Sequence, residues 1–175
     1  MERKVQIMDE QTINRSLARI THEIIERNNG CDNVVILGVK SRGVKIAQIL
    51  AKNVYKFEGK QAYFGEIDAT LRRDDYSEEQ KRAKATESVI PCDLKDKTVI
   101  IVDDVLYTGR TARAAIETVF AMARPKSVQL AVLIDRGHRE IPIRPDYVGK
   151  NIPTKKTEKV IVVLDEREEK GVFIV

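Results

Sequence analysis

Short, continuous apolar runs are the feature that most constrains the fold of this chain. Residues 34–39, 98–102 and 128–134 are apolar at almost every position and rich in β-branched side chains. Such runs are typical of strands buried on both faces, as in a parallel sheet. Residues 61–67 and 159–164 predict two further strands. We expect all five in one sheet.

Helical segments separate these runs. Residues 11–29 carry Ile13, Leu17, Ile20, Ile24 and Ile25 at helical spacing, and further helices are predicted at 44–54 and 111–123. Strands that alternate with helices predict an α/β domain with right-handed crossovers, here one domain over residues 1–175. In such sheets ligands bind at the carboxyl ends of the strands, so polar residues that directly follow strands are the candidates for function.

Residues 68–92 interrupt this alternation. The segment is densely charged and has few apolar side chains, so it shows no stripe that could face a core. A long stretch of this kind in a compact domain is usually a functional flap or a flexible surface loop. The residues alone leave both interpretations open.

Composition excludes some classes of protein. No apolar run approaches the ~20 residues of a membrane span, and Met1 to Lys4 lead into a mixed segment without the core of a secretory signal. We therefore expect a cytoplasmic protein in which Cys31 and Cys92, far apart in the chain, stay reduced. The net charge of +4 is a weak indication of a polyanionic partner, although the basic stretch 136–159 is also what a solvated surface looks like.

The strongest motif follows the run at 98–102. The acidic pair Asp103-Asp104 comes first, then a short turn with Thr108 and Gly109, then a helix that is expected to begin near Thr111. Backbone N–H groups of the turn and the helix dipole make a cradle for an anion. Two carboxylates beside it suit hydroxyl groups or a hydrated cation, so a sugar phosphate fits both halves. The Walker phosphate loop and the G-x-G-x-x-G dinucleotide turn are both absent.

Residues 99–111 resemble the phosphoribosyl diphosphate (PRPP) signature of type I phosphoribosyltransferases. The segments R-G-H-R-E at 136–140 and G-K-N-I-P at 149–153 are similar to the bifunctional pyrimidine-operon attenuator and uracil phosphoribosyltransferase family, PyrR, as are 19–26 and 65–75. The resemblance covers nearly the whole chain. It implies the type I fold, a mostly parallel sheet flanked by helices, with a flexible flap at about 68–92 and a small hood with the basic segment at about 135–159.

The resemblance also implies roles for single residues. Asp103 and Asp104 would hold the ribose hydroxyls, Ser41 and Arg42 the diphosphate, and Arg136 and Val160 the base. Arg42 would act with the acidic pair in catalysis. Arg72, Arg73 and Arg82 are candidates to reach the diphosphate from the flap. Arg82 ranks first, and Arg72 stands where the family pattern has Tyr. The 5-phosphate would be held by the turn, namely Val105, Leu106, Tyr107, Thr108, Gly109, Arg110 and Thr111. Mg²⁺ would be held by diphosphate, ribose hydroxyls and water, without a direct protein ligand.

The implied activities are the formation of UMP and diphosphate from uracil and PRPP, and binding of pyrimidine-operon leader mRNA in response to UMP or UTP. Candidate RNA contacts are Arg19, His22, Arg139, Arg144 and Lys150. A homodimer or homotetramer is expected. Two alternatives stay open. One is a salvage phosphoribosyltransferase without an RNA role, and the other is an RNA-binding regulator that uses the nucleotide pocket only as a sensor.

Overall fold

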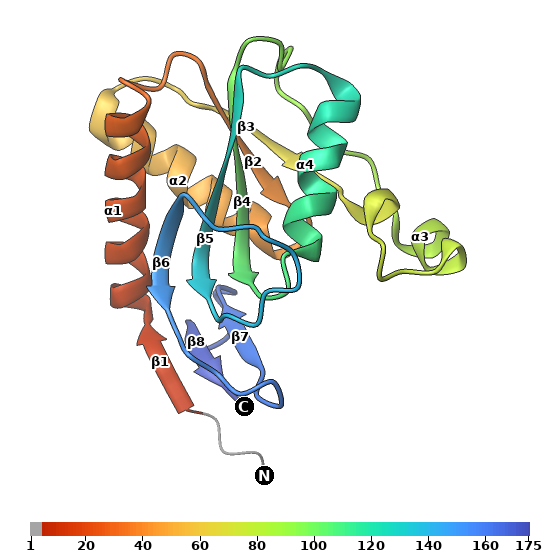
Figure 1. Cartoon of the computed structure of the whole chain (residues 1–175). Coiled ribbons are helices and arrows are strands. Elements are labelled where there is room, and N and C mark those ends of the chain that lie inside the picture. The colour runs from red at the N-terminus through yellow and green to blue at the C-terminus, as the bar shows by residue number, and fades with distance from the viewer. Residues whose placement is uncertain (1–4) are drawn as a thin grey trace.

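The computed structural model describes residues 5–175, so Met1 to Lys4, with which the signal-peptide argument begins, lie outside the described residues. Figure 1 shows a central sheet with helices on both faces and a smaller sheet at one end. The elements in chain order are β1 (Val5–Asp9), α1 (Glu10–Arg27), β2 (Val34–Val39), α2 (Arg42–Glu58), β3 (Tyr63–Ile67), the 3₁₀ turn η1 (Thr70–Arg72), α3 (Glu78–Lys84), β4 (Thr98–Leu106), α4 (Arg110–Met122), β5 (Ser127–Asp135), β6 (Tyr147–Asn151), β7 (Val160–Val163) and β8 (Gly171–Ile174).

The main sheet confirms the predicted α/β class. Its five strands are parallel and lie in the order β3-β2-β4-β5-β6. The predicted strands at 34–39, 61–67, 98–102 and 128–134 correspond to β2, β3, β4 and β5. The edge strand β6 was not predicted, because only Tyr147 among its residues is buried and the apolar signal is therefore weak.

Each face of the main sheet is covered by helices with an apolar stripe. Ile100 and Val102 of β4 belong to the core formed with α1 and α2, whereas Val99 and Ile101 belong to the core formed with α4. This alternation follows from the two-residue period of a strand. Burial of both faces explains why the central strands are continuous apolar runs. Asp9 caps the start of α1, and its carboxylate accepts a hydrogen bond from Thr12 N at 2.8 Å.

The smaller sheet corrects one prediction. Residues 159–164 do form a strand, β7, but it pairs with β8 in an antiparallel sheet of order β1-β8-β7 and does not join the parallel sheet. Residues 152–159 alone connect β6 to β7, which is fewer than the dozen or so residues of a usual parallel crossover. The small sheet lies at the carboxyl ends of β4, β5 and β6 (Figure 1).

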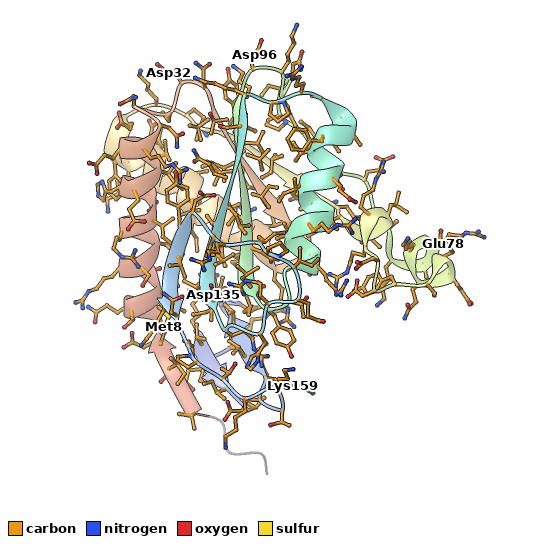
Figure 2. The ribbon with its side chains drawn as sticks, in the orientation of Figure 1. Met8, Asp32, Glu78, Asp96, Asp135 and Lys159 are labelled. Carbon is orange, nitrogen blue, oxygen red and sulfur yellow. The ribbon has the colours of Figure 1, made fainter. Side chains whose placement is uncertain are left out.

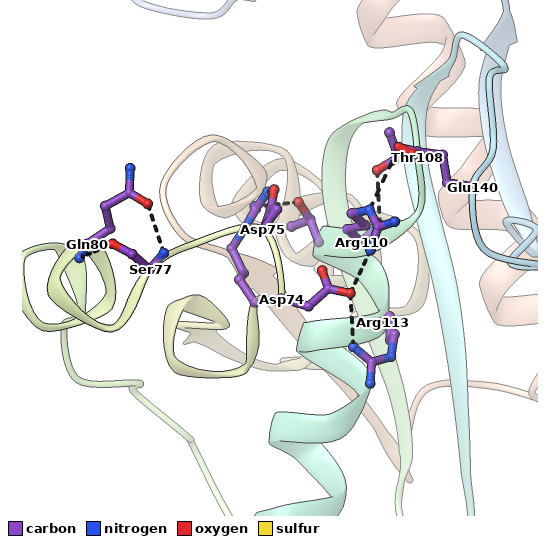
Figure 3. Close-up of polar contacts among 10 residues, drawn as sticks. Asp74, Asp75, Ser77, Gln80, Thr108, Arg110, Arg113 and Glu140 are labelled. Carbon is purple, nitrogen blue, oxygen red and sulfur yellow. Dashed lines mark hydrogen bonds and ion pairs between the residues drawn. The ribbon is translucent and has the colours of Figure 1, made fainter.

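Residues 68–92 leave the main sheet after β3 and return at Val89, which bridges Glu66. Between them lie η1 and α3, and α3 projects away from the sheet (Figure 1). The helix α3 has no buried residue, so apolar periodicity did not reveal it. It is stabilised locally by a capping box, in which Ser77 and Gln80 each bond the other's backbone (Figure 3).

The two cysteines are free thiols. Cys31 is buried and Cys92 is half-buried, and no disulfide joins them. Among the described residues no helix is long and apolar enough to cross a membrane.

Candidate active site

The carboxyl ends of the parallel strands form one edge of the main sheet, which faces the small sheet. Figure 2 shows Asp135, the last residue of β5, at this edge, while Asp32 and Asp96 mark the opposite end. The first turn of α2 lies directly beside β4, since a Cβ atom added at Gly43 would be only 2.2 Å from the carbonyl oxygen of Val102. The peptide bond between Lys40 and Ser41, just before this turn, is cis.

The acidic pair lies inside β4 and does not follow it. The strand was predicted to end at residue 102, but pairing with β5 continues to Leu106 opposite Asp135. Both carboxylates accept a hydrogen bond from the next backbone N–H, since Asp104 N bonds Asp103 Oδ1 at 2.9 Å and Val105 N bonds Asp104 Oδ1 at 2.8 Å. The strand geometry therefore fixes both side chains.

Because successive side chains of a strand point to opposite faces, the two carboxylates open into different cavities. Asp104 lines a cavity of about 440 Å³ together with Ser41, Arg42 and Lys45, closed on the other side by residues 161–165 and Glu168. The structure thus brings together the predicted diphosphate loop and one member of the acidic pair. Asp103 lines a second cavity of about 310 Å³ at the start of α4.

The second cavity is built from the turn after β4. It is lined by residues 105–112, together with Arg73, Asp75, Asp103, Leu130, Val132 and Glu140. Gly109, the residue before α4, has φ of +94° and provides no side-chain cap. The N–H of Arg110 donates to Thr108 Oγ1 at 3.3 Å, and the N–H groups of Thr111 and Ala112 that follow it are the ones that suit a ligand. A buried helix start beside hydroxyl groups suits a phosphate.

Burial raises the pKa of the Asp103 carboxyl well above its ordinary value, and the negative charge of Asp104 adds to this effect. The Arg73 guanidinium acts in the opposite direction, but less strongly. The cavity at the start of α4 therefore holds one carboxyl that is costly to ionise without a ligand.

Arg136 and Arg139 are held by internal contacts. The guanidinium of Arg139 donates to the carbonyl oxygens of Tyr107 and Ile143 and to the Asp135 carboxylate. The Arg136 guanidinium lies 4.1 Å from the centre of the Tyr107 ring and donates to the carbonyl of Lys155. These contacts tie the segment after β5 to the turn after β4. The roles assigned to the two residues, base recognition for Arg136 and RNA binding for Arg139, stay predictions.

The other candidate RNA contacts are spread over α1 and the segment that ends in β6. The side chain of Arg19 in α1 donates to the carbonyl oxygens of Val148 and Gly149, at 3.1 and 2.8 Å. It therefore contacts β6, the strand that carries the exposed Lys150. Arg144 is exposed in the segment before that strand. The exposed His22 stacks on Phe57 with the ring centroids 4.1 Å apart. The fold therefore brings Arg19 and Lys150 to one surface.

Sequence reasoning missed the contacts between the segment 68–92 and α4. Asp74 pairs with Arg110 at 2.6 Å and with Arg113 at 3.6 Å (Figure 3). Arg73, a candidate for the diphosphate, lies at the start of α4, where it donates to Thr111 Oγ1. Arg82 is exposed on α3. The run Arg73-Asp74-Asp75 was a signal for ion pairing, but sequence alone does not identify the partners.

Comparisons with known proteins agree with this geometry. The model of the phosphoribosyl transferase domain matches residues 5–168. A solved hypoxanthine phosphoribosyltransferase of Trypanosoma cruzi superposes with a TM-score of 0.73 at 20% identity, over 97% of this chain and 94% of that one. A hypoxanthine phosphoribosyltransferase from Staphylococcus aureus gives a TM-score of 0.69 at 22% identity, over 94% of this chain and 84% of that one. At these identities the two structures show the fold alone.

A curated relative is much more similar. The bifunctional protein PyrR of Bacillus subtilis (strain 168) is 52% identical over 171 residues, which are 97% of this chain and 94% of the relative. The chain belongs to the phosphoribosyltransferase family and, within it, to the bifunctional PyrR proteins.

The raised pKa of Asp103 predicts a pH-dependent effect of Asp103→Asn on stability. The folded protein holds a proton on this carboxyl more strongly than the unfolded chain, whose pKa is near the ordinary 3.8, so wild-type stability is lost as pH rises above that value. Asp103→Asn should therefore be more stable than wild type at pH 7, with a difference that shrinks as pH falls toward 4. Urea unfolding at a series of pH values measures this difference.

Asp96→Asn is the matched control, because it removes an exposed carboxylate at the far end of the sheet. A difference between Asp103→Asn and wild type that stays constant from pH 4 to pH 8 would contradict the assigned burial of Asp103.

Proposed function

We propose that this chain converts uracil and PRPP into UMP and diphosphate, and that it binds the leader of pyrimidine-operon mRNA in response to UMP or UTP. The observation that carries the proposal is the acidic pair in β4, whose two side chains open into a cavity beside the diphosphate loop and a cavity at the start of α4. The 52% identity to a bifunctional PyrR protein supports both halves of the proposal.

The two cavities suit the two ends of PRPP. The 5-phosphate accepts hydrogen bonds from backbone N–H groups and hydroxyls of Thr108 to Thr111, where the α4 dipole favours negative charge. Asp103 and Asp104 accept hydrogen bonds from the ribose hydroxyls between the cavities. Ser41 and Arg42 hold the diphosphate beside Asp104.

The reaction exchanges one bond at the anomeric carbon of ribose. The bond from this carbon to the diphosphate oxygen breaks, a bond to N1 of uracil forms, and the N1 proton passes to the departing diphosphate or to solvent. Positive charge develops on the ribose in between, and the adjacent carboxylates of Asp103 and Asp104 stabilise it. Closure of residues 68–92 excludes water from this intermediate stage. Arg136 and the backbone at Val160 are the proposed contacts of the base.

The site fits Mg²⁺ bound together with PRPP. Carboxylate oxygens beside a diphosphate are the hard donors that this ion prefers, and residues 5–175 contain no cluster of three ligating side chains that would hold an ion alone. Diphosphate, ribose hydroxyls and water would hold it, with Asp103 and Asp104 nearby. When bound, it neutralises the charge of the leaving diphosphate.

The proposed RNA surface includes Arg19, Arg144 and Lys150, with His22 and Arg139 as further candidates. Arginine suits phosphates and stacked bases of RNA loops. We propose that a homodimer or homotetramer in the cytoplasm presents this surface. One observation favours the alternative of a salvage enzyme without an RNA role: Arg139 and Arg19 already use donors on carbonyl groups of the fold itself.

Asp104→Asn should abolish most formation of UMP. The substitution removes a charge beside the reacting carbon, and losses on the order of 100-fold are typical for such groups. Turnover of labelled uracil with PRPP and Mg²⁺ measures the effect. The exposed Asp96→Asn variant should keep wild-type turnover, and comparable turnover in Asp104→Asn would refute the assignment.

The RNA half predicts binding of the host's pyrimidine-operon leader that UMP strengthens and salt weakens. Filter binding at low and moderate salt, with a scrambled transcript for comparison, measures it. The double variant Arg144→Gln, Lys150→Gln should bind more weakly and reduce the salt slope by about 1 for each phosphate that is no longer neutralised. The matched control is Lys52→Gln, Arg124→Gln, which removes two other exposed cations. No preference for the leader over the scrambled transcript would leave the salvage enzyme.

A further inference from the structure

The guanidinium of Arg73 lies in the wall of the cavity at the start of α4. Its Nη1 donates a hydrogen bond to Thr111 Oγ1 at 2.6 Å, and its side chain is only 20% exposed. Arg73 lines the cavity together with Asp103 and the turn 105–111. A residue of the segment 68–92 thus reaches the groups that we propose to bind the 5-phosphate.

Neighbouring side chains fix the orientation of this guanidinium. Asp75 accepts two hydrogen bonds from it, from Nε at 2.8 Å and from Nη2 at 2.6 Å. The ring of Tyr76 lies against it, 4.5 Å from the ring centre to Cζ. An arginine has five N–H donors, and these contacts with Thr111 and Asp75 use three of them. One N–H on Nη1 and one on Nη2 remain for a ligand.

The hydrogen bond from Arg73 also orients the hydroxyl group of Thr111. Because Thr111 Oγ1 accepts from Arg73, its own proton can be donated to a ligand in the same cavity. Arg110 lines the cavity as well, but its guanidinium pairs with Asp74 at 2.6 Å and lies 3.7 Å from Glu140 (Figure 3). Both arginines are paired with an aspartate, but Arg73 also bonds a hydroxyl of the cavity wall, so its free N–H groups are the better placed to bind a phosphate there.

We propose that Arg73 is a ligand that the flap, residues 68–92, contributes to the 5-phosphate. The phosphomonoester end of the ribose, and not the diphosphate, then fixes the part of the flap around Arg73, which we call the flap root. The proposal rests on the proposed function for the identity of that phosphate. PRPP and UMP share this group, so both fix the flap root. Free diphosphate does not.

Binding of ribose 5-phosphate to the full chain, measured by calorimetry, tests the proposal without catalysis. Arg73→Gln should weaken binding by roughly 10- to 100-fold, the usual worth of a charge-assisted pair of hydrogen bonds. The affinity of Arg73→Lys should lie between those of wild type and Arg73→Gln, because lysine keeps the charge but lacks the planar guanidinium that donates two parallel hydrogen bonds. The control Arg113→Gln removes a nearby cation that pairs with Asp74 of the same segment but does not line the cavity. This variant should bind ribose 5-phosphate as wild type does.

Limited trypsin cleavage at the exposed Arg82 and Lys84 reports on the flap itself. Ribose 5-phosphate should slow cleavage in wild type and in Arg113→Gln but not in Arg73→Gln, and magnesium diphosphate should slow it in none of them. Equal affinity of Arg73→Gln and Arg113→Gln for ribose 5-phosphate would overturn the proposal. If wild type forms no UMP but binds ribose 5-phosphate through Arg73, the proposal stands and the proposed enzymatic function fails.

Discussion

The contact between Gly43 and β4 is the constraint on which the site depends. Only a residue without a side chain can lie where a Cβ atom would be 2.2 Å from the carbonyl oxygen of Val102. This approach places the first turn of α2, and with it the residues just before it, beside the strand that carries the acidic pair. Ser41, Arg42 and Asp104 then line one cavity, although they are far apart in the sequence. The distance between the predicted diphosphate residues Ser41 and Arg42 and the acidic pair is therefore set by backbone packing, which side-chain motion changes little.

The acidic pair divides the site because it belongs to a strand. Neighbouring residues of a strand face opposite sides of the sheet, so Asp103 and Asp104 point into different cavities. A ligand that occupied both cavities would contact one carboxylate on each side. The same geometry leaves Asp103 half-buried, and its desolvation raises the pKa of its carboxyl, while Arg73 partly offsets the cost of its charge. A flap residue is thus coupled electrostatically to a carboxylate of the rigid sheet.

The sequence was informative where burial produces periodicity and weak where it does not. The strands β2, β4 and β5 and the helices α1, α2 and α4 were predictable, because each buries an apolar run or stripe. The edge strand β6 and the helix α3 were missed, since most of their side chains are exposed. The place of β7 was wrong because a run of β-branched residues does not reveal the strand with which it pairs. The contacts of Arg139 with backbone carbonyls likewise leave no pattern in the sequence.

A single phosphoribosyl site is proposed to serve both catalysis and regulation. Binding of the leader transcript by Asp104→Asn, measured with and without a titration of UMP, tests this directly. We expect this variant to bind RNA as wild type does without UMP, but to gain no affinity when UMP is added. A gain equal to that of wild type would place the regulatory nucleotide at another site and contradict the proposal.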